Sequence, residues 1–359
     1  MKVLENAPLK SFNTFWINVT AKYLITIDSE SDIIEVVKDD RYHNLSKFIL
    51  GGGSNTLFTD DYEGIVLRNR IMGKHVFEET DREVVLSIGA GEDWHEFVTY
   101  AVENGWSGIE NLALIPGTVG GAPVQNIAAY GENFEDVFHS LDYIDLSTGE
   151  KITFNKEDCK FGYRDSIFKN ELKGKAFVTN VRIRLSKEGT LETSYFSIGR
   201  RYDSVQSELE AIAKEPYSIK DVYQAVINIR SRKLLDPKDA PTVGSFFINP
   251  IITRQKYEEL LKVDPEMQAY PIDQLTYVKM DNPDFSQDEY VKIPVGRLLD
   301  ISGWIGKKIG NCMVHDQWAS IITHNGNATG QEMLAFISTI QKDIQGRYGI
   351  DLKSEVSIV

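Results

Sequence analysis

The chain has 359 residues, of which 42% are hydrophobic and 26% are charged, and its formal net charge is −14. This composition is that of a folded globular protein and excludes a disordered or low-complexity chain. The negative charge argues against a protein that binds nucleic acid or membrane surfaces by long-range attraction. The length exceeds that at which a single hydrophobic core stops growing, so we expect two or three domains with clefts between them.

Signals for targeting and cross-linking are few. The N-terminus lacks an apolar stretch of signal-peptide length, and no later run approaches the roughly 18 residues that span a bilayer. We therefore expect a cytoplasmic protein. Cys159 and Cys312 are the only cysteines, and neither has the neighbouring cysteine or histidine that a metal site needs, so we expect neither a structural disulfide nor a bound metal.

Short strands dominate the first half of the chain. Apolar runs between glycine, asparagine and aspartate turns predict strands at residues 23–27, 47–50, 65–68, 83–88, 141–146 and 176–185. Helices are predicted after Ser29 and after Asp93, where apolar residues recur at the spacing of one helix face. Because strands and helices do not alternate as βαβ units, the predicted fold class is α+β.

The second half begins with a polar stretch, residues 206–217, that we interpret as an interdomain connection. Helices are predicted from Ser218 and from Thr329, which forms a capping-box pattern with Glu332. Residues 264–290 show no clear period and are interpreted as a surface excursion. A terminal strand is predicted from alternating apolar residues, Ile350, Leu352, Val356 and Ile358. Glu355 would point to the other face of that strand, either towards a site or simply into solvent.

The first glycine-rich segment, Gly51-Gly52-Gly53-Ser54-Asn55, follows the predicted strand at residues 47–50. Three residues without side chains let backbone amides approach a ligand closely, which suits a pyrophosphate. The segment is neither a G-x-G-x-x-G motif nor a Walker loop. A plain tight turn is the alternative interpretation.

The second glycine-rich segment, residues 115–131, is apolar and short of charge. It suits a wall against which a flat, mostly uncharged ring system and its diphosphate lie. The alternative is a buried crossover between domains. The candidate cofactor-binding residues in this segment are Ile115, Pro116, Gly117, Gly120, Gly121, Gln125, Asn126, Ala129, Tyr130 and Gly131.

Residues 161–169, which read Phe-Gly-Tyr-Arg-Asp-Ser-Ile-Phe-Lys, carry more functional groups than a structural strand needs. Arg164 offers a planar fork of donors that can hold a carboxylate or a developing enolate through two parallel hydrogen bonds. A surface turn whose Arg164 and Asp165 face water is the alternative.

Ser245 lies between Gly244 and two phenylalanines, where we expect its hydroxyl to be desolvated and held in one rotamer. No His-Asp pattern is present that would make it a nucleophile. A serine that donates a proton to a carbanion needs no such base. The alternative is a serine that satisfies a local turn.

Taken in chain order, these segments resemble the UDP-N-acetylenolpyruvoylglucosamine reductase (MurB) family. The resemblance spans nearly the whole chain and is carried by residues 13–15, 51–55, 110–112, 115–131, 161–169, 244–250 and Glu355. It implies an FAD-binding fold of the vanillyl-alcohol-oxidase type, with two subdomains at residues 1–72 and 73–205. A substrate-binding α+β domain at residues 206–359 would follow.

The resemblance also implies an activity, the NADPH-dependent reduction of UDP-N-acetylglucosamine enolpyruvate to UDP-N-acetylmuramate through noncovalent FAD, in peptidoglycan precursor synthesis. Arg164 and Glu355 would polarise the substrate carboxylate, and Ser245 would protonate its C2 atom. The implied substrate-binding residues are Tyr163, Tyr195, Lys233 and Asn249. Of these, Tyr195 matches a tyrosine that closes over the UDP group in one subtype. We expect a monomer that acts on small molecules, without nucleic acid or membrane partners.

Two positions depart from the family pattern. Ile248 stands where the family often has a lysine, a phosphate contact that Lys233 or Lys238 can replace, and Arg297 stands where an aromatic residue is expected. Two other functions stay open. An FAD-dependent oxidase of a sugar or hydroxy acid has no evident use for Ser245 together with Glu355, and a flavin-free nucleotide-sugar binding protein has no use for two glycine-rich phosphate segments.

Overall fold

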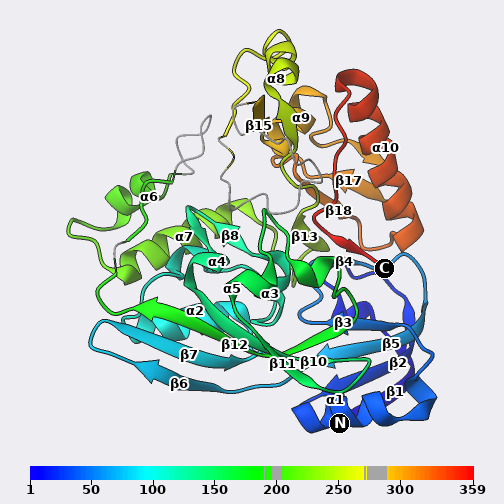
Figure 1. The fold of residues 1–359 in the computed structure, drawn as a ribbon. Coiled ribbons are helices and arrows are strands. Elements are labelled where there is room, and N and C mark those ends of the chain that lie inside the picture. Colours follow the sequence, from blue (N-terminus) through cyan, green and yellow to red (C-terminus); the bar gives the residue numbers. More distant parts are fainter. Residues whose placement is uncertain (190, 196–203, 271, 273–288) are drawn as a thin grey trace. The chain divides into compact units, whose positions relative to one another are not determined.

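The computed structural model describes residues 1–189, 191–195, 204–270, 272 and 289–359 (Figure 1). The chain divides into two compact units. Unit 1 consists of Met1–Ala7, Ala21–Gly52 and Glu63–Lys233, and unit 2 consists of Pro8–Thr20, Gly53–Tyr62 and Leu234–Val359. The chain therefore passes between the units more than once, and one of these passages falls inside the first glycine-rich segment.

Unit 1 contains a four-stranded sheet in the order β1-β2-β5-β3. Its strands are β1 (Lys2–Pro8), β2 (Thr20–Ile27), β3 (Lys47–Leu50) and β5 (Tyr62–Asn69). Helix α1 (Glu30–Lys38) begins at the capping box of Ser29 and Asp32. It buries Ile33 and Val36 in the same core as Ile25 and Ile65 of the sheet. A 3-10 turn, η2 (Asp40–Tyr42), follows this helix.

A second sheet of unit 1 has the order β11-β10-β12-β7-β6, and all its pairs are antiparallel. Its strands are β6 (Lys74–Glu79), β7 (Glu83–Gly89), β10 (Phe138–Asp145), β11 (Lys151–Phe154) and β12 (Ala176–Ser186). Helices α2 (Trp94–Glu103) and α7 (Ile219–Lys233) share a hydrophobic core with strands of this sheet. The core thus supports both helices that border the second glycine-rich segment.

Short elements complete unit 1. They are η3 (Glu110–Leu112), α3 (Gly121–Gln125), β8 (Ala128–Ala129), β9 (Glu132–Asn133), α4 (Phe134–Val137), α5 (Lys156–Cys159), η4 (Ile167–Lys169) and α6 (Val205–Ile212).

Unit 2 contains a four-stranded sheet in the order β13-β18-β17-β16, and the two-stranded pairs β14-β15 and β19-β4. The strands are β4 (Thr56–Leu57), β13 (Thr242–Ser245), β14 (Ile251–Thr253), β15 (Tyr290–Lys292), β16 (Lys308–Ile309), β17 (Cys312–Val314), β18 (Ile321–His324) and β19 (Ser357–Ile358). The helical elements are η1 (Lys10–Phe12), α8 (Arg254–Leu261), α9 (Val295–Ile301) and α10 (Gly330–Tyr348).

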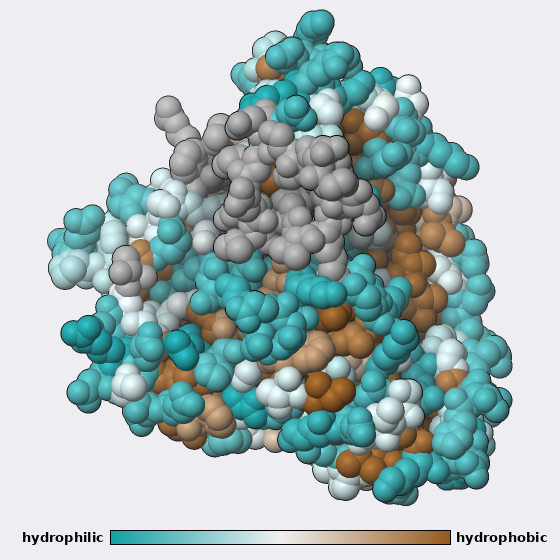
Figure 2. Space-filling view, viewed as in Figure 1, coloured by the Kyte–Doolittle hydropathy of each residue, from teal (hydrophilic) through white to brown (hydrophobic). Residues whose placement is uncertain are grey.

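The helices of unit 2 differ in how many of their side chains are buried. Helix α10 begins at the predicted capping box of Thr329 and Glu332 and places Phe336 and Ile340 in the core. Helix α8 buries only Leu260, and Figure 2 shows hydrophilic side chains over the end of unit 2 where α8 lies. None of the helices in the described part of the chain is long and apolar enough to cross a membrane.

The α+β class is confirmed, and the predicted helices and internal strands are present. The terminal strand is wrong in its extent, because the strand that forms covers only Ser357 and Ile358, which pair with the two-residue strand β4, whereas Ser354 makes only an isolated bridge. Ile358 is 40% exposed, whereas Ile350, Leu352 and Val356 are buried as predicted. The domain boundaries after residues 72 and 205 stay predictions.

Most of the 264–290 excursion lies outside the described residues. Its first residue, Asp264, accepts two hydrogen bonds from Arg297, from Nε at 2.6 Å and from Nη2 at 2.8 Å. Arg297 departs from the family pattern, and this bidentate pair shows what the arginine does instead: it fixes the point where the excursion begins.

Candidate functional site

The two glycine-rich segments meet inside unit 1. A Cβ atom added to Gly52 would lie 2.9 Å from the Cα atom of Gly117, and one added to Gly51 would lie 2.7 Å from the hydroxyl oxygen of Thr118. Backbone this close leaves no room for a larger residue at position 52. Gly52 is itself exposed, so its main chain remains accessible to a ligand.

A small-residue turn, Gly89-Ala90-Gly91, packs against the second glycine-rich segment. A Cβ atom on Gly120 would lie 2.7 Å from the Ala90 Cβ atom, and Gly120 N donates a hydrogen bond of 2.9 Å to Ala90 O. Val119 N donates to Glu92 O at the same distance. Unit 1 therefore holds a cradle of closely packed main chain, which is the surface that a diphosphate requires.

The remainder of the first glycine-rich segment belongs to unit 2. Gly53 has a φ of +66°, and an added Cβ atom would overlap the main chain of η1, so only glycine fits there. Ser54 is half-buried. The side-chain amide of Asn55 donates to the main-chain carbonyl oxygen of Glu355 at 3.1 Å, which places one predicted cofactor residue beside the main chain of a predicted catalytic residue.

Ser245 and Glu355 lie on adjacent stretches of chain in unit 2. Glu355 N donates to Phe246 O at 2.9 Å, and Ile248 N donates to Lys353 O at 3.1 Å. An antiparallel bridge between residues 247 and 354 lies between these two bonds. These two stretches of main chain are therefore neighbours in the fold although they are far apart in sequence.

The surroundings of Ser245 differ from the expectation of a desolvated hydroxyl. Phe246 and Phe247 are 0% and 1% exposed, with ring centroids 5.3 Å apart. Because these rings fill the core of unit 2, the preceding serine is left on the surface and is exposed. The Ser245 hydroxyl oxygen lies 3.3 Å from that of Ser320. The protein's own side chains therefore do not desolvate this hydroxyl.

Arg164 stands in a tight turn of unit 1. Gly162 and Asp165 exchange backbone hydrogen bonds of 2.9 Å and 3.1 Å, which leaves Tyr163 and Arg164 as the two turn residues. Arg164 has a φ of +55°, a left-handed conformation that glycine normally supplies. Arg164 is half-buried. Its guanidinium donates from Nη2 to Ala128 O at 2.8 Å, and its Cζ atom lies 5.7 Å from the centroid of the Tyr163 ring. Arg164 therefore does not simply face water.

Side-chain hydrogen bonds join this turn to the second glycine-rich segment. Besides the bond from Arg164, they run from Asn126 Nδ2 to Gly162 O at 2.9 Å, from Ser166 Oγ to Val124 O at 2.9 Å, and from Lys169 Nζ to Gln125 Oε1 at 3.1 Å. Gln125 and Asn126, both predicted to bind the cofactor, thus use side-chain atoms inside the protein, and Asn126 is buried.

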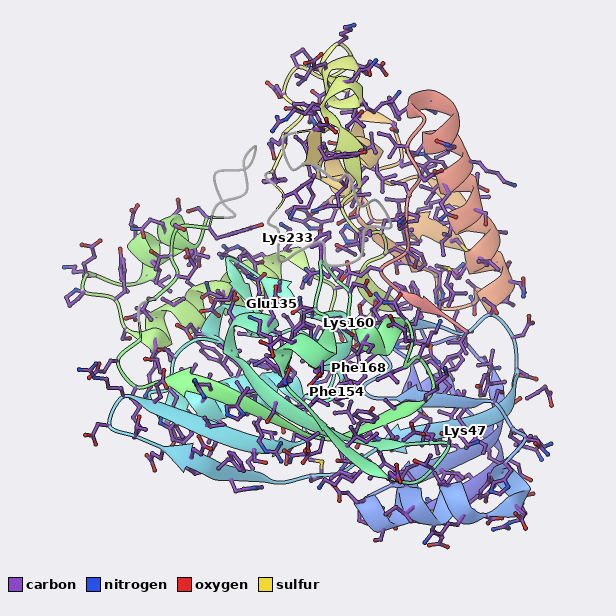
Figure 3. The ribbon with its side chains drawn as sticks, viewed as in Figure 1. Lys47, Glu135, Phe154, Lys160, Phe168 and Lys233 are labelled. Atoms are coloured by element: carbon purple, nitrogen blue, oxygen red, sulfur yellow. The ribbon has the colours of Figure 1, made fainter. Side chains whose placement is uncertain are left out.

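Aromatic packing supports the Arg164 turn. Phe168 follows the turn in η4, and its ring centroid lies 6.1 Å from that of Tyr143 and 6.2 Å from that of Phe154. Figure 3 labels Phe154 and Phe168 next to each other. Because this cluster ties the turn to the β10–β11 part of the sheet, the arginine is presented from a rigid base.

Left-handed backbone is concentrated around these segments. Five of the seven described non-glycine residues with a positive φ lie within residues 115–131 and 161–169 or immediately before them, namely Leu114, Asn126, Tyr130, Lys160 and Arg164. Each such conformation costs on the order of 1–3 kcal/mol and persists where the surrounding structure enforces it. The other predicted cofactor residues of the segment, Ile115, Pro116, Ala129 and Gly131, are half-buried or exposed.

The predicted substrate-binding residues lie in both units. Tyr195 of unit 1 is 40% exposed, and its ring meets that of Tyr130 edge to face at 5.3 Å. The next residue of its motif, Phe196, lies outside the described residues. Lys233 is the last residue of α7 (Figure 3) and is half-buried. In unit 2, Asn249 Oδ1 accepts a hydrogen bond of 3.0 Å from the first residue of α9. A convergence of all these side chains on one site stays a prediction.

Arg230 was not predicted from the sequence. It donates from Nη2 to Leu114 O at 3.2 Å and interacts with the side chains of Tyr130 and Arg164, while burial lowers the pKa of its guanidinium. A second cation therefore lies beside the predicted catalytic arginine. The sequence did contain one signal for its position. Arg230 follows the buried residues Val222 and Val226 at the i, i+4 spacing of one face of α7.

Two carboxyl groups lie behind the second glycine-rich segment. Glu110 is fully buried, and its Oε2 atom accepts hydrogen bonds from Gly108 N at 2.6 Å and Ile109 N at 3.1 Å. Glu132 Oε2 accepts from Asn111 N at 3.0 Å. Burial first, and then the neighbouring Glu110 carboxyl, raises the pKa of Glu132 to about 9. The pair therefore favours a protonated Glu132 at neutral pH.

This pair gives stability a predictable dependence on pH. Glutamate in the unfolded chain ionises near pH 4.5, so between that pH and about 9 the folded state retains a proton that the unfolded state releases. Stability conferred by Glu132 is full below this window and falls as the pH rises through it. Glu132→Gln removes the titration and keeps an oxygen for Asn111 N. We expect the variant to exceed the wild type at about pH 8 by about 1–3 kcal/mol, with a smaller difference at about pH 5.

Urea unfolding at both pH values measures this difference. Glu150→Gln, at an exposed position, is the matched control and should leave the pH dependence of unfolding unchanged. Parallel pH profiles for wild type and Glu132→Gln would show that Glu132 is ionised in the folded protein.

Comparisons with known proteins identify the family of this chain. A family model for an FAD binding domain matches residues 21–155, and the model of the UDP-N-acetylenolpyruvoylglucosamine reductase C-terminal domain matches residues 236–359. The UDP-N-acetylenolpyruvoylglucosamine reductase of Flavobacterium johnsoniae is 39% identical over 359 residues, 100% of both chains. That of Burkholderia lata is 38% identical over 355 residues, 99% of this chain and 96% of the other.

Solved structures show the same fold. The UDP-N-acetylenolpyruvylglucosamine reductase (MurB) of Thermus caldophilus aligns with a TM-score of 0.64 and 19% identity over 99% of this chain and 98% of that one. A solvent-stable cholesterol oxidase aligns with a TM-score of 0.51 and 9% identity over 99% of this chain and 86% of that one. The predicted FAD-binding α+β fold is confirmed. Given the identity to curated relatives along its full length, this chain belongs to the UDP-N-acetylenolpyruvoylglucosamine reductase family.

Proposed function

We propose that this protein reduces UDP-N-acetylglucosamine enolpyruvate to UDP-N-acetylmuramate, with noncovalent FAD as cofactor and NADPH as reductant. The observation that carries the proposal is the main-chain pairing of residues 246–248 with residues 353–355, which supports a site that uses the Ser245 hydroxyl and the Glu355 carboxylate. A reductase that must protonate a carbanion needs both groups. Membership of the family supports the same activity.

The main-chain cradle of unit 1 fits the diphosphate of FAD. Gly52 and Gly120 admit no side chain without displacing Gly117 or Ala90, and a site of packed amides is what a dinucleotide requires. The glycine-rich segments contain no cysteine or histidine, so we propose a cofactor held without a covalent bond. When bound, FAD would supply the hydride that it has taken from NADPH.

The protein's own residues then have distinct roles. Arg164 would hold the enolpyruvyl carboxylate by its planar fork, and Glu355 would help to polarise it, so that charge developing at C2 is stabilised as an enolate. Ser245 would give its hydroxyl proton to C2 after hydride has reached C3. Hydride and proton together reduce the carbon–carbon double bond, and the serine regains a proton from solvent.

Substrate binding requires local cations, because the chain as a whole carries a formal charge of −14. We propose that Lys233 and Asn249 hold the diphosphate or the sugar, that Tyr163 lines the pocket, and that Tyr195 closes over the UDP group as in the tyrosine-loop subtype. We further propose a cytoplasmic monomer that acts on small molecules and does not bind nucleic acid.

Turnover with the defined substrates tests this function. Purified protein, NADPH and the enolpyruvyl nucleotide sugar should give NADPH loss that depends on the sugar, with one UDP-N-acetylmuramate formed per NADPH consumed. Oxygen-dependent oxidation of a sugar or hydroxy acid without NADPH would identify an oxidase instead. A colourless protein that binds the nucleotide sugar would identify a flavin-free binding protein.

Two glycine substitutions offer a matched test of the cofactor cradle. Gly120→Ala would bring a methyl group within 2.7 Å of Ala90 Cβ, whereas the methyl group of Gly346→Ala, in helix α10, would meet no atom within 4 Å. We expect Gly120→Ala to weaken FAD binding by about tenfold or more, because the segment must move to relieve the overlap. FAD content after gel filtration and titration of the apoprotein measure the effect. Equal retention of FAD by both variants would argue against the cradle.

A further inference from the structure

The segment that carries Tyr195 is anchored within unit 1 by two separate contacts. Asn111 Nδ2 donates to Glu192 O at 2.8 Å and to Tyr130 O at 2.7 Å. A Cβ atom on Gly131 would lie 2.6 Å from Glu192 Cγ, so Glu192 packs where that glycine has no side chain. One asparagine thus joins the start of the Tyr195 segment to the turn at Tyr130.

Glu192 extends this anchorage towards Tyr195. Its Oε1 atom accepts hydrogen bonds from Ser194 N at 2.6 Å and from Ser194 Oγ at 2.5 Å. These bonds fix the residue immediately before Tyr195. The Tyr195 carbonyl accepts from Val205 N at 3.2 Å, and its ring meets Tyr130 at an interplanar angle of 77°. The orientation of Tyr195 therefore depends on its own ring contact and on Glu192.

The base of this arrangement is rigid. Asn111 is fully buried, and its main-chain N–H donates to Glu132 at 3.0 Å. Buried side chains with several hydrogen bonds have few alternative positions. Glu192, in contrast, is half-buried, so it can be replaced with less risk to folding.

We propose that Glu192 is a positioning residue for substrate binding, which sets Tyr195 against the Tyr130 turn and so governs how tightly the nucleotide of the substrate is held. The proposal rests on the proposed function, because that function supplies the contact between Tyr195 and the nucleotide. Glu192 contacts neither Arg164 nor Ser245 through any described hydrogen bond. Its effect should therefore fall on substrate KM and not on the hydride or proton steps.

Two substitutions at position 192 separate positioning from general damage. Glu192→Ala removes the acceptor for both Ser194 donors, and Glu192→Gln retains an Oε1 acceptor. We expect Glu192→Ala to raise the KM for the enolpyruvyl substrate about tenfold, with kcat within about threefold of wild type, because about one good hydrogen bond is lost. Glu192→Gln should restore KM to within about threefold. FAD content and the rate of flavin reduction by NADPH should be unchanged in both variants.

Gly131→Ala tests the same contact from the other side, since its methyl group would displace Glu192. Gly105→Ala is the control: Gly105 also has a positive φ, +74° against +92° for Gly131, but no atom lies within 4 Å of an added Cβ. We expect Gly131→Ala alone to raise substrate KM. An unchanged KM in Glu192→Ala, or no restoration by Glu192→Gln, with wild-type turnover intact, would overturn this proposal alone. Absence of wild-type turnover would overturn the proposed function and this inference together.

Discussion

Ser245→Ala is expected to stop the second half-reaction while sparing the first. Reduction of the enzyme by NADPH should proceed at nearly the wild-type rate, because the serine plays no part in that step. Oxidation by the enolpyruvyl substrate should slow by about a hundredfold to ten-thousandfold, which is what one positioned proton donor contributes. Stopped-flow absorbance of the flavin, with each half-reaction started separately, measures both rates.

Ser320→Ala is the comparison for this variant, because the Ser320 hydroxyl is the neighbour of Ser245 at 3.3 Å. This variant loses a hydroxyl from the same surface but keeps the proposed proton donor. We therefore expect the rate of each half-reaction to change by less than about tenfold. Ser245→Cys keeps an S–H group and should recover part of the rate. If Ser245→Ala slowed both half-reactions equally, the serine would have a structural role and not a proton-donating one.

Arg164→Lys is expected to lower kcat/KM for the enolpyruvyl substrate by about a hundredfold to a thousandfold. Lysine retains the positive charge but not the planar fork, so the carboxylate loses its two parallel hydrogen bonds. The bond from Nη2 to Ala128 O, which aims the guanidinium, is lost as well. Steady-state kinetics together with the rate of flavin reduction by NADPH measure the effect, and flavin reduction should remain close to wild type.

Arg184→Lys is the matched control, because Arg184 is an exposed residue of β12 and should tolerate the same exchange. Near-normal kcat/KM for Arg164→Lys would mean that a point charge is sufficient and that bidentate recognition is not used. A rise in KM with kcat unchanged would assign Arg164 to substrate binding alone.

Local patterns in the sequence were sufficient to predict most elements of this fold. The capping box of Thr329 and Glu332 and the apolar spacing after it predict α10, and the same reasoning predicts α1 and α2. Strand β6 was missed because all six of its residues are exposed, so no alternation between apolar and polar positions marks it. The predicted terminal strand was too long. Ile358 continues the alternation of apolar residues in the sequence, but it is exposed and does not enter a core.

The candidate site was predictable where it depends on residue type and not where it depends on packing. The two glycine-rich segments were interpreted as backbone surfaces for a pyrophosphate and a ring system, but the close approaches of Gly52 to Gly117 and of Gly120 to Ala90 become visible only in the fold. The exposure of Ser245 could not be predicted, because it follows from where the two phenylalanines pack. Partly buried charged groups such as Arg230 leave little local signature in a sequence.

The left-handed residues at positions 114, 126, 130 and 164 also constrain how this enzyme can be engineered. Glycine adopts such angles without steric cost, so a redesign for heat resistance would select it at these positions. At 164 the exchange would delete the guanidinium, and at 130 it would delete the ring that Tyr195 touches. At these positions, a substitution that raises thermal stability would therefore lower turnover. A more stable variant must gain its stability elsewhere, for example on the exposed face of β6.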